Sequence, residues 1–500
     1  MKQGKVWLVG AGPSDAGLLT LKGKRLLETA DVVVYDRLVG TAILGMIPKG
    51  VRQIDVGKRA GHHPVPQEEI NAILLREAQQ GNRVVRLKGG DPFLFGRGGE
   101  ELELLTEHGV PFEVVPGVPS AIAVPAYAGI PVTHRDFCSS VHIITAHKKR
   151  GSTDKLDYAK LVGLDGTLVF LMGVGALADI CHGLLEAGME ETMPAAVLER
   201  GTTAAQQRIV STVAELPQKA ALAQIQTPAI ILVGKVCALA EMFHWAEDRP
   251  LGGARVFVTR PREKASRLAE QLTDLGAEVL ELPAIATKAI QPNAALERVL
   301  VQLEQYQWVV FTSAAAVEIF FEALKRRRMD VRTLAGMKFA VVGRATQRAV
   351  EEHGLFVDVV PEQFGGRALG EAMARRVAAG EQVLLLRAKE AHPDLGEVLT
   401  KKGIAFEDVA VYETILEEGS AIEVQEGDLA AFASASAVKG FVQAVSCAEV
   451  SKVQAVCIGP QTAAEAGKQG MACVVAKNAT IDDLVNAVVL AYRGEEEVLR

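Results

Sequence analysis

The sequence predicts an α/β protein along its whole length of 500 residues, built from two different halves. Short apolar runs repeatedly end in glycine or in small hydroxylated residues, and a helix-like stretch follows each of them. A polar segment with proline and glycines, at residues 245–253, separates the halves and predicts a linker. After this segment, the order of strand–helix units occurs twice, which indicates an internal duplication.

Composition argues against several classes of protein before any motif is considered. Hydrophobic residues make up 49% of the chain, which suffices for several cores, and the formal net charge of −7 argues against a general nucleic-acid binder. Neither a signal peptide nor an apolar run of membrane-spanning length is visible, so we expect a cytoplasmic protein. The six cysteines show no CxxC spacing, which predicts reduced and mostly buried thiols.

The first strand–helix unit is close to a dinucleotide-binding unit without matching it. An apolar run at residues 6–9 precedes the glycines of 10–12, and a second apolar run stops at Asp36. Asp15 stands where that fingerprint needs its third glycine. A further strand ends at residues 89–91, where two adjacent glycines allow a ligand to lie against the backbone. Because a dinucleotide domain has no use for this second loop, the two loops together favour another cofactor.

Several motifs, taken in order, resemble the tetrapyrrole methylase family over residues 4 to about 240. These motifs are VGAGPSD, YDRLVG, DVGKRAGHH, VVRLKGGDPFLFGRGGEE, VPGVPSAIAVPAYAGIPVTHRDF and GTLVFLMG. They are similar in particular to those of uroporphyrinogen-III C-methyltransferases. The resemblance implies a methylase fold of two α/β lobes, with S-adenosylmethionine in the cleft between them and no NAD. On this interpretation the first glycine loop belongs to that cleft.

The resemblance also implies roles for individual residues. Asp36 matches the family's proton acceptor and Lys58 its proton donor, whereas the residues alone would favour a turn residue and a solvated lysine. Two departures from the family pattern concern the cofactor site, since Ser14 replaces a glycine and Pro119 replaces a threonine. The implied cofactor contacts are Pro13, Gly89, Gly90, Asp91, Leu94, Pro119, Ser120, Met172 and Gly201.

The part after the linker contains three kinds of strand–helix unit that recur in the same order. Residues 311–313 correspond to 432–434, and residues 343–346 correspond to 459–462. Six units in two sets predict two similar parallel-sheet lobes, and chance similarity between generic units is the alternative. Hydroxylated residues in these turns would cap helices singly or bind a polyanionic substrate together, and they include Thr312, Ser313, Ser434 and Ser436.

The motifs of this part resemble those of uroporphyrinogen-III synthase from about residue 252 to 500, namely VTRP, FTSAAAV, VVGRAT, VAVYET, FASASAV and IGPQTA. Tyr412 and Thr462 match family positions proposed to assist the departure of a hydroxyl group. The resemblance implies that the chain crosses twice between the two lobes. One lobe would then consist of residues 254–287 plus 413–500, and the other of residues 288–412.

Together, the two resemblances predict a bifunctional enzyme with a methylase at 1–244 and a synthase at 254–500. The synthase would close hydroxymethylbilane to uroporphyrinogen III with inversion of ring D. The methylase would then methylate this product twice to precorrin-2, for siroheme or cobalamin. We expect small tetrapyrroles as partners, a homodimer formed through the methylase half, and no nucleic acid, membrane or metal. The alternative is a methylase of another tetrapyrrole with a non-catalytic, ligand-sensing C-terminal module.

Two short motifs receive simpler interpretations. His62-His63 has no further ligands at useful spacing, so a solvated or substrate-facing pair is favoured over a metal site. The HKKR stretch at 147–150 predicts an exposed loop rather than a nucleic-acid patch.

No dehydrogenase–chelatase module precedes residue 4, so we expect the chain to stop at precorrin-2 and to need neither NAD nor iron.

Overall fold

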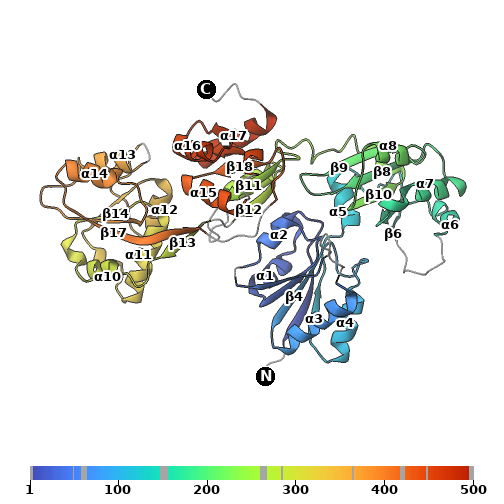
Figure 1. The fold of residues 1–500 in the computed structure, drawn as a ribbon, viewed down its shortest axis with the longest axis horizontal. Coiled ribbons are helices and arrows are strands. Elements are labelled where there is room, and N and C mark those ends of the chain that lie inside the picture. Colours follow the sequence, from blue (N-terminus) through green and yellow to red (C-terminus); the bar gives the residue numbers. More distant parts are fainter. Residues whose placement is uncertain are drawn as a thin grey trace.

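The structure is a computed structural model. It describes residues 4–48, 50–57, 65–146, 156–259, 267–282, 285–362, 365–416, 423–445 and 449–494. In these residues the chain forms four five-stranded sheets, two in each half, with helices packed on them (Figure 1). Lys58, His62-His63 and the stretch 147–150 lie outside the described residues, so their roles stay predictions.

The first lobe is a wholly parallel sheet with the strand order β3-β2-β4-β1-β5. Its central strands are mostly apolar, apart from Arg86 and Lys88 on β4, and a separate core cluster covers each face. The carboxyl ends of the strands therefore meet at one edge, where Asp36 and Gly89 follow β2 and β4. The elements are β1 (Lys5–Gly10), α1 (Leu21–Thr29), β2 (Val32–Tyr35), α2 (Thr41–Gly45), β3 (Arg52–Asp55), α3 (Gln67–Gln79), β4 (Arg83–Lys88), α4 (Gly98–Glu107) and β5 (Phe112–Val115).

The second lobe is a mixed sheet with the strand order β6-β7-β10-β8-β9. Only β6 and β7 pair in parallel, and the other neighbours are antiparallel. Helix α5 (Ser120–Tyr127) leads from the first lobe into the second and packs Ala121 and Val124 into the core of the second. The other elements are β6 (Val141–Thr145), α6 (Tyr158–Val162), β7 (Thr167–Leu171), α7 (Leu177–Glu186), β8 (Pro194–Glu199), β9 (Gln207–Thr212), α8 (Leu216–Leu222) and β10 (Ala229–Val233).

The third lobe is a parallel sheet with the strand order β12-β11-β18-β19-β20, built from both ends of the C-terminal half. It lies between the fourth lobe and the N-terminal half (Figure 1). Its elements are β11 (Arg255–Thr259), α9 (Arg267–Asp274), β12 (Glu278–Leu282), β18 (Leu429–Phe432), α15 (Ala435–Ala444), β19 (Gln454–Cys457), α16 (Pro460–Lys468), β20 (Cys473–Val475) and α17 (Ile481–Arg493).

The fourth lobe has the strand order β13-β17-β16-β14-β15, and its last four strands repeat the strand arrangement of the third lobe. The order β17-β16-β14-β15 corresponds to β12-β11-β18-β19, so each sheet combines one unit of one set with two units of the other. The duplication expected from the sequence thus appears as a shared topology. Its elements are β13 (Ile285–Ala289), α10 (Ala294–Val301), β14 (Trp308–Phe311), α11 (Ala314–Arg326), β15 (Lys338–Val341), α12 (Arg344–Glu352), α13 (Gly366–Met373), β16 (Val383–Ala388), α14 (Asp394–Lys401) and β17 (Phe406–Leu416).

The two crossings between the third and fourth lobes lie side by side as an antiparallel pair. Strand β13 pairs with β17 from Ile285 opposite Leu416 to Ala289 opposite Tyr412. The lobe boundaries expected from the sequence, 287/288 and 412/413, fall inside these two strands. The connection is therefore a two-stranded ribbon (Figure 1) rather than a pair of separate loops.

The junction between the halves contains no helix or strand of its own at residues 246–253, yet it is packed. Leu251 is fully buried in the core of the third lobe, and its N–H donates to the carbonyl of Leu275 at 2.9 Å. Helix α2 of the first lobe also lies against β12, and Ala42 packs on the third lobe's core. The halves therefore touch along a surface in addition to being joined in sequence.

Two further expectations concern the burial of the cysteines and the absence of membrane-spanning segments. Among the described cysteines, all of which are free, Cys181, Cys237 and Cys457 are buried. Cys138 is half-buried, and Cys473, which begins the edge strand β20, is the exposed exception to the expected burial. Within the described ranges, every helix is too short or too polar to cross a membrane.

Candidate active sites

The two glycine loops of the first lobe are joined backbone to backbone. Gly12 and Gly90 form an isolated antiparallel bridge, in which Gly90 N–H donates to Gly12 at 2.7 Å and Gly12 N–H donates back at 3.1 Å. A Cβ built on Gly10 would lie 2.5 Å from the Cα of Gly117, in the loop after β5. The loops that follow β1, β4 and β5 can therefore approach this closely only because glycines stand at the contact.

Gly90 differs from its neighbour in having open space beside it. A Cβ on Gly89 would lie 2.5 Å from the Cβ of Leu38, so that position is filled by protein. Gly90 has a φ of +67°, and a Cβ there would meet only Ser120 N at 3.8 Å and Pro119 Cα at 4.0 Å. Pro119 precedes α5 without a side-chain cap, and the backbone nitrogen of Ser120, the first residue of that helix, is the atom nearest to this space. The arrangement is a cradle between a glycine backbone and a helix N-terminus.

Asp91, a predicted cofactor contact, uses its carboxylate within the protein. Its Oδ1 accepts from the N–H groups of Phe93 at 2.8 Å and Leu94 at 3.2 Å. Its Oδ2 accepts from the N–H of Gly117 at 3.0 Å. Asp91 therefore ties the loop after β4 to the loop after β5, and it brings Leu94 and the Gly90 cradle into one fixed unit.

A residue that the sequence did not indicate closes the cleft from the second lobe. The Thr202 hydroxyl donates to the carbonyl of Pro13 at 2.9 Å, which brings the predicted contacts Pro13 and Gly201 together. A Cβ on Gly201 would lie 2.3 Å from Val124 of α5, so this glycine permits close packing of the turn on that helix. Met172 follows β7 with a φ of +56° and is 52% exposed, and its contact with a cofactor stays a prediction.

Asp15 stabilises the first glycine loop through hydrogen bonds of its carboxylate. Its Oδ1 accepts from the N–H of Gly17 at 2.7 Å, and its Oδ2 accepts from the Tyr127 hydroxyl at 2.6 Å. Burial and this bond to Asp15 raise the pKa of Tyr127 above its ordinary value. Ser14 takes a φ of +124°, the left-handed conformation expected from the glycine that it replaces. The loop is therefore held by side chains where the dinucleotide fingerprint uses a glycine.

Asp36 lies at the carboxyl end of β2, in contact with a cluster of buried charges. Its Oδ1 accepts from the N–H of Leu38 at 3.1 Å, and its Oδ2 lies 3.4 Å from Nη2 of Arg86. Arg86 and Lys88 lie two apart on β4 and therefore share a face, on which both reach Oε1 of Glu101, at 3.2 and 2.7 Å. Burial, helped by Arg86 and opposed by Glu101, lowers the pKa of Lys88.

This cluster was missed at the level of sequence because its members are far apart in the chain. The only signal in the local sequence is that Arg86 and Lys88 stand in a mostly apolar strand. Buried charges require partners, so such a pair indicates a partner of opposite charge. Oε2 of Glu101 has no hydrogen-bond partner among the described residues. The cluster fixes Arg86 behind Asp36, and 26% of the Asp36 side chain remains exposed.

In the C-terminal half, the predicted residues of the fourth lobe form one contact. The Tyr412 hydroxyl, on β17, donates to Oγ of Ser313 at 2.9 Å, and Ser313 in turn caps α11 by accepting from Ala316 N–H at 3.2 Å. Burial, opposed by the bond to Ser313, raises the pKa of Tyr412. Thr312 lies next to this pair and is half-buried.

The corresponding turns of the third lobe are built in the same way. Ser434 caps α15 by accepting from Ala437 N–H at 3.2 Å, and its hydroxyl lies 3.0 Å from that of Ser436. Thr462 lies in the first turn of α16 and is 5% exposed, and its counterpart Thr346 in α12 is 4% exposed. Tyr412 and Thr462 therefore belong to different lobes. The helix-capping interpretation holds for Ser313 and Ser434, while their contact with a substrate stays a prediction.

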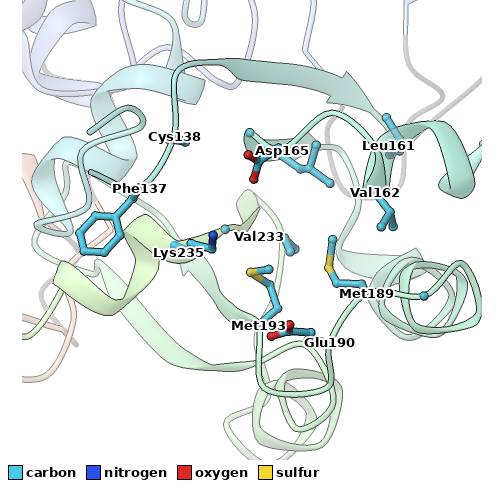
Figure 2. A pocket seen from close by; sticks show the side chains of 14 residues that line it. Phe137, Cys138, Leu161, Val162, Asp165, Met189, Glu190, Met193, Val233 and Lys235 are labelled. Atoms are coloured by element: carbon cyan, nitrogen blue, oxygen red, sulfur yellow. The ribbon is translucent and has the colours of Figure 1, made fainter. Parts of the chain in front are cut away.

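Two cavities are lined by other residues, although the second lies close to Tyr412, because Ala289, which pairs with Tyr412, and Glu413 line it. One, of about 230 Å³, lies in the second lobe, where Phe137, Asp165, Met193 and Lys235 surround it (Figure 2). The other, of about 380 Å³, lies beside β13 and β17 in the fourth lobe. None of the predicted site residues lines either cavity. Among the residues that the structure describes, no group of histidine, cysteine or carboxylate side chains is arranged to hold a metal ion.

Known proteins match the two halves separately and the whole chain together. The family model of the tetrapyrrole (corrin/porphyrin) methylases matches residues 5–217, and that of uroporphyrinogen-III synthase HemD matches residues 266–486. The "Porphyrin biosynthesis protein HemD" of Ruminiclostridium josui is 47% identical over 495 residues, which are 98% of each chain.

Two further relatives match smaller parts. The "Uroporphyrinogen-III C-methyltransferase" of Bacillus subtilis (strain 168) is 42% identical over 72% of this chain and 74% of its own. A crystal structure of uroporphyrin-III C-methyl transferase from Thermus thermophilus, complexed with S-adenyl homocysteine, is 40% identical, with a TM-score of 0.41. It covers 47% of this chain and 99% of its own. On the full-length match and the two family models, the chain belongs to the family of porphyrin-biosynthesis proteins that join a tetrapyrrole methylase to a HemD-type uroporphyrinogen-III synthase.

Proposed function

We propose that the chain closes hydroxymethylbilane to uroporphyrinogen III in its C-terminal half and methylates this product twice to precorrin-2 in its N-terminal half. The observation that carries the proposal is the full-length match to a porphyrin biosynthesis protein by a chain with two sheets in each half. The first reaction makes the substrate of the second, so the fusion would join consecutive steps.

Local structure supports S-adenosylmethionine as a ligand where the first and second lobes meet. Any Cβ on Gly90 would project into the open space beside it, and this space is bounded by the N-terminus of α5. We propose that the cofactor lies against Gly89-Gly90, with Pro13, Ser120, Met172 and Gly201 around it. The bound cofactor would supply an electrophilic methyl group. Leu94 and Pro119 would border the same space, and Asp91 would act by holding their loops in place.

Asp36 is the proposed proton acceptor of the methylase. When a tetrapyrrole carbon attacks an electrophilic methyl group, the macrocycle cation that results must lose a proton, and a fixed carboxylate at the end of a strand suits that step. The buried Arg86 contacts Oδ2 of Asp36, and the part of the Asp36 side chain that stays exposed would accept the proton from the substrate. Lys58, the proposed proton donor, lies outside the described residues.

In the synthase half we propose that the third and fourth lobes bind the carboxylates of the bilane between them. Capped helix N-termini and the hydroxyls of Thr312, Ser313, Ser434 and Ser436 would supply the donors. Burial raises the pKa of Tyr412, which favours its neutral hydroxyl, and this hydroxyl would donate a hydrogen bond to the departing hydroxyl group. Thr462 lies at a tight helix entrance, and we expect Thr462→Ala to be the most damaging substitution of the site.

Separate assays test the two halves. Purified full-length protein given hydroxymethylbilane should yield uroporphyrinogen III, and a yield of only the unrearranged isomer I would refute the synthase. Given uroporphyrinogen III and S-adenosylmethionine, it should yield a product with two added methyl groups. Methylation of a different tetrapyrrole, together with a C-terminal half that binds hydroxymethylbilane without converting it, would establish the alternative of a methylase with a ligand sensor. Cytoplasmic location, dimerisation through the methylase half and the choice between siroheme and cobalamin stay predictions.

A further inference from the structure

One turn of the second lobe is held from two sides by different halves of the protein. This turn, residues 201–206, follows β8 and contains Gly201 and Thr202. On one side the Thr202 hydroxyl reaches the Pro13 carbonyl of the first glycine loop at 2.9 Å. On the other side the N–H of Ala204 donates to Oε2 of Glu278 at 2.8 Å. Glu278 is the first residue of β12, an edge strand of the synthase half.

The backbone of this turn needs such support because its conformation is intrinsically unfavourable. Arg200, just before the turn, and Thr202 within it have φ values of +46° and +67°, which residues other than glycine rarely adopt. Within the turn, Thr202 N–H donates to the side-chain oxygen of Gln206 at 2.9 Å. The Glu278 contact adds a charged acceptor from outside, which makes a stronger bond than a neutral one.

A second set of contacts leads from the same glycine loop to the synthase half. The Tyr127 hydroxyl donates to Asp15, and the Tyr127 ring packs edge-on against Trp245, with ring centroids 5.1 Å apart. The guanidinium of Arg249 lies 5.9 Å from the Trp245 ring centroid and donates to the carbonyl of Asp274 at 2.7 Å, at the end of α9. Two of the loops that carry proposed cofactor contacts, at Pro13 and at Gly201, are therefore linked to the third lobe.

We propose that the synthase half completes the cofactor site of the methylase, with Glu278 as the positioning residue that holds turn 201–206 against the Pro13 loop. The inference rests on the proposed function, since it assumes that S-adenosylmethionine occupies that cleft. Glu278 touches neither cofactor nor tetrapyrrole in this account. Its carboxylate limits the movement of a strained turn, so cofactor binding costs less ordering of the protein.

The test uses the full-length protein and the variant Glu278→Ala, with S-adenosylmethionine as the titrated ligand in a calorimeter. We expect roughly tenfold weaker binding, which corresponds to about 1.4 kcal/mol. In steady state the KM for S-adenosylmethionine should rise while kcat changes little, because the chemical step is untouched. Formation of uroporphyrinogen III by the other half should remain at the wild-type rate. Glu278→Gln keeps an oxygen acceptor and should restore most of the affinity.

A matched control is Glu270→Ala, which removes an exposed glutamate from α9 of the same lobe and should leave cofactor affinity unchanged. Wild-type affinity in Glu278→Ala would overturn the inference. If Glu278→Ala loses both activities, Glu278→Gln decides: recovery of cofactor affinity supports the positioning role, and failure to recover it overturns that role. A wild-type protein that does not bind S-adenosylmethionine would instead refute the proposed function, which keeps the two failures distinguishable.

Discussion

Replacing Gly90 with alanine puts a methyl group into the space proposed for the cofactor and leaves the protein contacts almost intact. The new Cβ would meet Ser120 N at 3.8 Å and Pro119 Cα at 4.0 Å, which are ordinary contact distances. The substitution has a backbone cost, because a φ of +67° is unfavourable for alanine by roughly 1–2 kcal/mol. The methyl group would also overpack a bound ligand, at a cost of about 1–3 kcal/mol.

The two costs can be separated by a control at Gly109. This glycine follows α4 with a φ of +62°, and a Cβ there would have nothing within 4 Å. Gly109→Ala therefore reproduces the backbone cost of Gly90→Ala without a ligand space beside it. Chemical denaturation should show similar losses of unfolding free energy for the two variants, about 1–2 kcal/mol each.

Calorimetric titration with S-adenosylmethionine then tests the site itself. We expect Gly90→Ala to bind about ten- to a hundredfold more weakly than wild type, and Gly109→Ala to bind as wild type does. Gly90→Val adds two further carbons and should abolish binding. Wild-type affinity in Gly90→Ala would show that the cofactor does not lie against this glycine. Equal loss in both alanine variants would mean that destabilisation, not overpacking, is responsible.

Four further predictions concern both halves. Asp36→Asn should lower methyl transfer by about 10²–10⁴-fold in single-turnover assays while calorimetry shows unchanged cofactor affinity, and near-normal turnover would return Asp36 to a turn residue. Tyr412→Phe removes one donor among many, so uroporphyrinogen III should still form about ten- to a hundredfold more slowly, and complete loss without unfolding would contradict this. A fragment starting at residue 252 lacks the buried Leu251 and should be about 2–5 kcal/mol less stable to denaturant than one starting at 245, whereas equal midpoints would show that Leu251 adds nothing. Hydrogen bonds, foremost from Lys338, lower the pKa of Glu381 to about 2. The ionised Glu381 therefore stabilises the folded state above the unfolded-state pKa of this group, and that stabilisation disappears as pH falls toward 2. Glu381→Gln should flatten the acidic part of the curve of unfolding free energy against pH, and curves identical to wild type would contradict this role of Glu381.

Local patterns in the sequence were enough to predict the strand–helix units and the duplicated order of the C-terminal half. Apolar runs and glycine-rich turns are set by neighbouring residues, so they can be read without knowledge of the fold. The antiparallel ribbon of β13 and β17 could not be read in this way. It depends on pairing Ala289 with Tyr412, and pairing between distant segments leaves no mark in either one.

The residues of the candidate site also differ in whether the sequence alone could identify them. Gly90 and Asp36 carry local signals, namely a double glycine after a strand and an acid at a strand end. Thr202 carries none, because its partner Pro13 lies 189 residues away. Composition was also an incomplete guide to the junction between the halves. Its polar, glycine-containing sequence predicts a linker, but the apolar Leu251 packs this segment into the core of the third lobe. Side chains that act by joining distant loops became visible only in the structure.

The central claim is that one chain carries out two consecutive steps on a tetrapyrrole. The most direct measurement supplies the full-length protein with hydroxymethylbilane, with and without S-adenosylmethionine, and determines the masses and isomers of the products. Without the methyl donor, we expect uroporphyrinogen III. With the donor, we expect a product with two more methyl groups, which is heavier by two CH₂ units because each methylation releases a proton. The account would be contradicted if the protein released only the isomer I that forms without a synthase, or if the donor left the mass of the product unchanged.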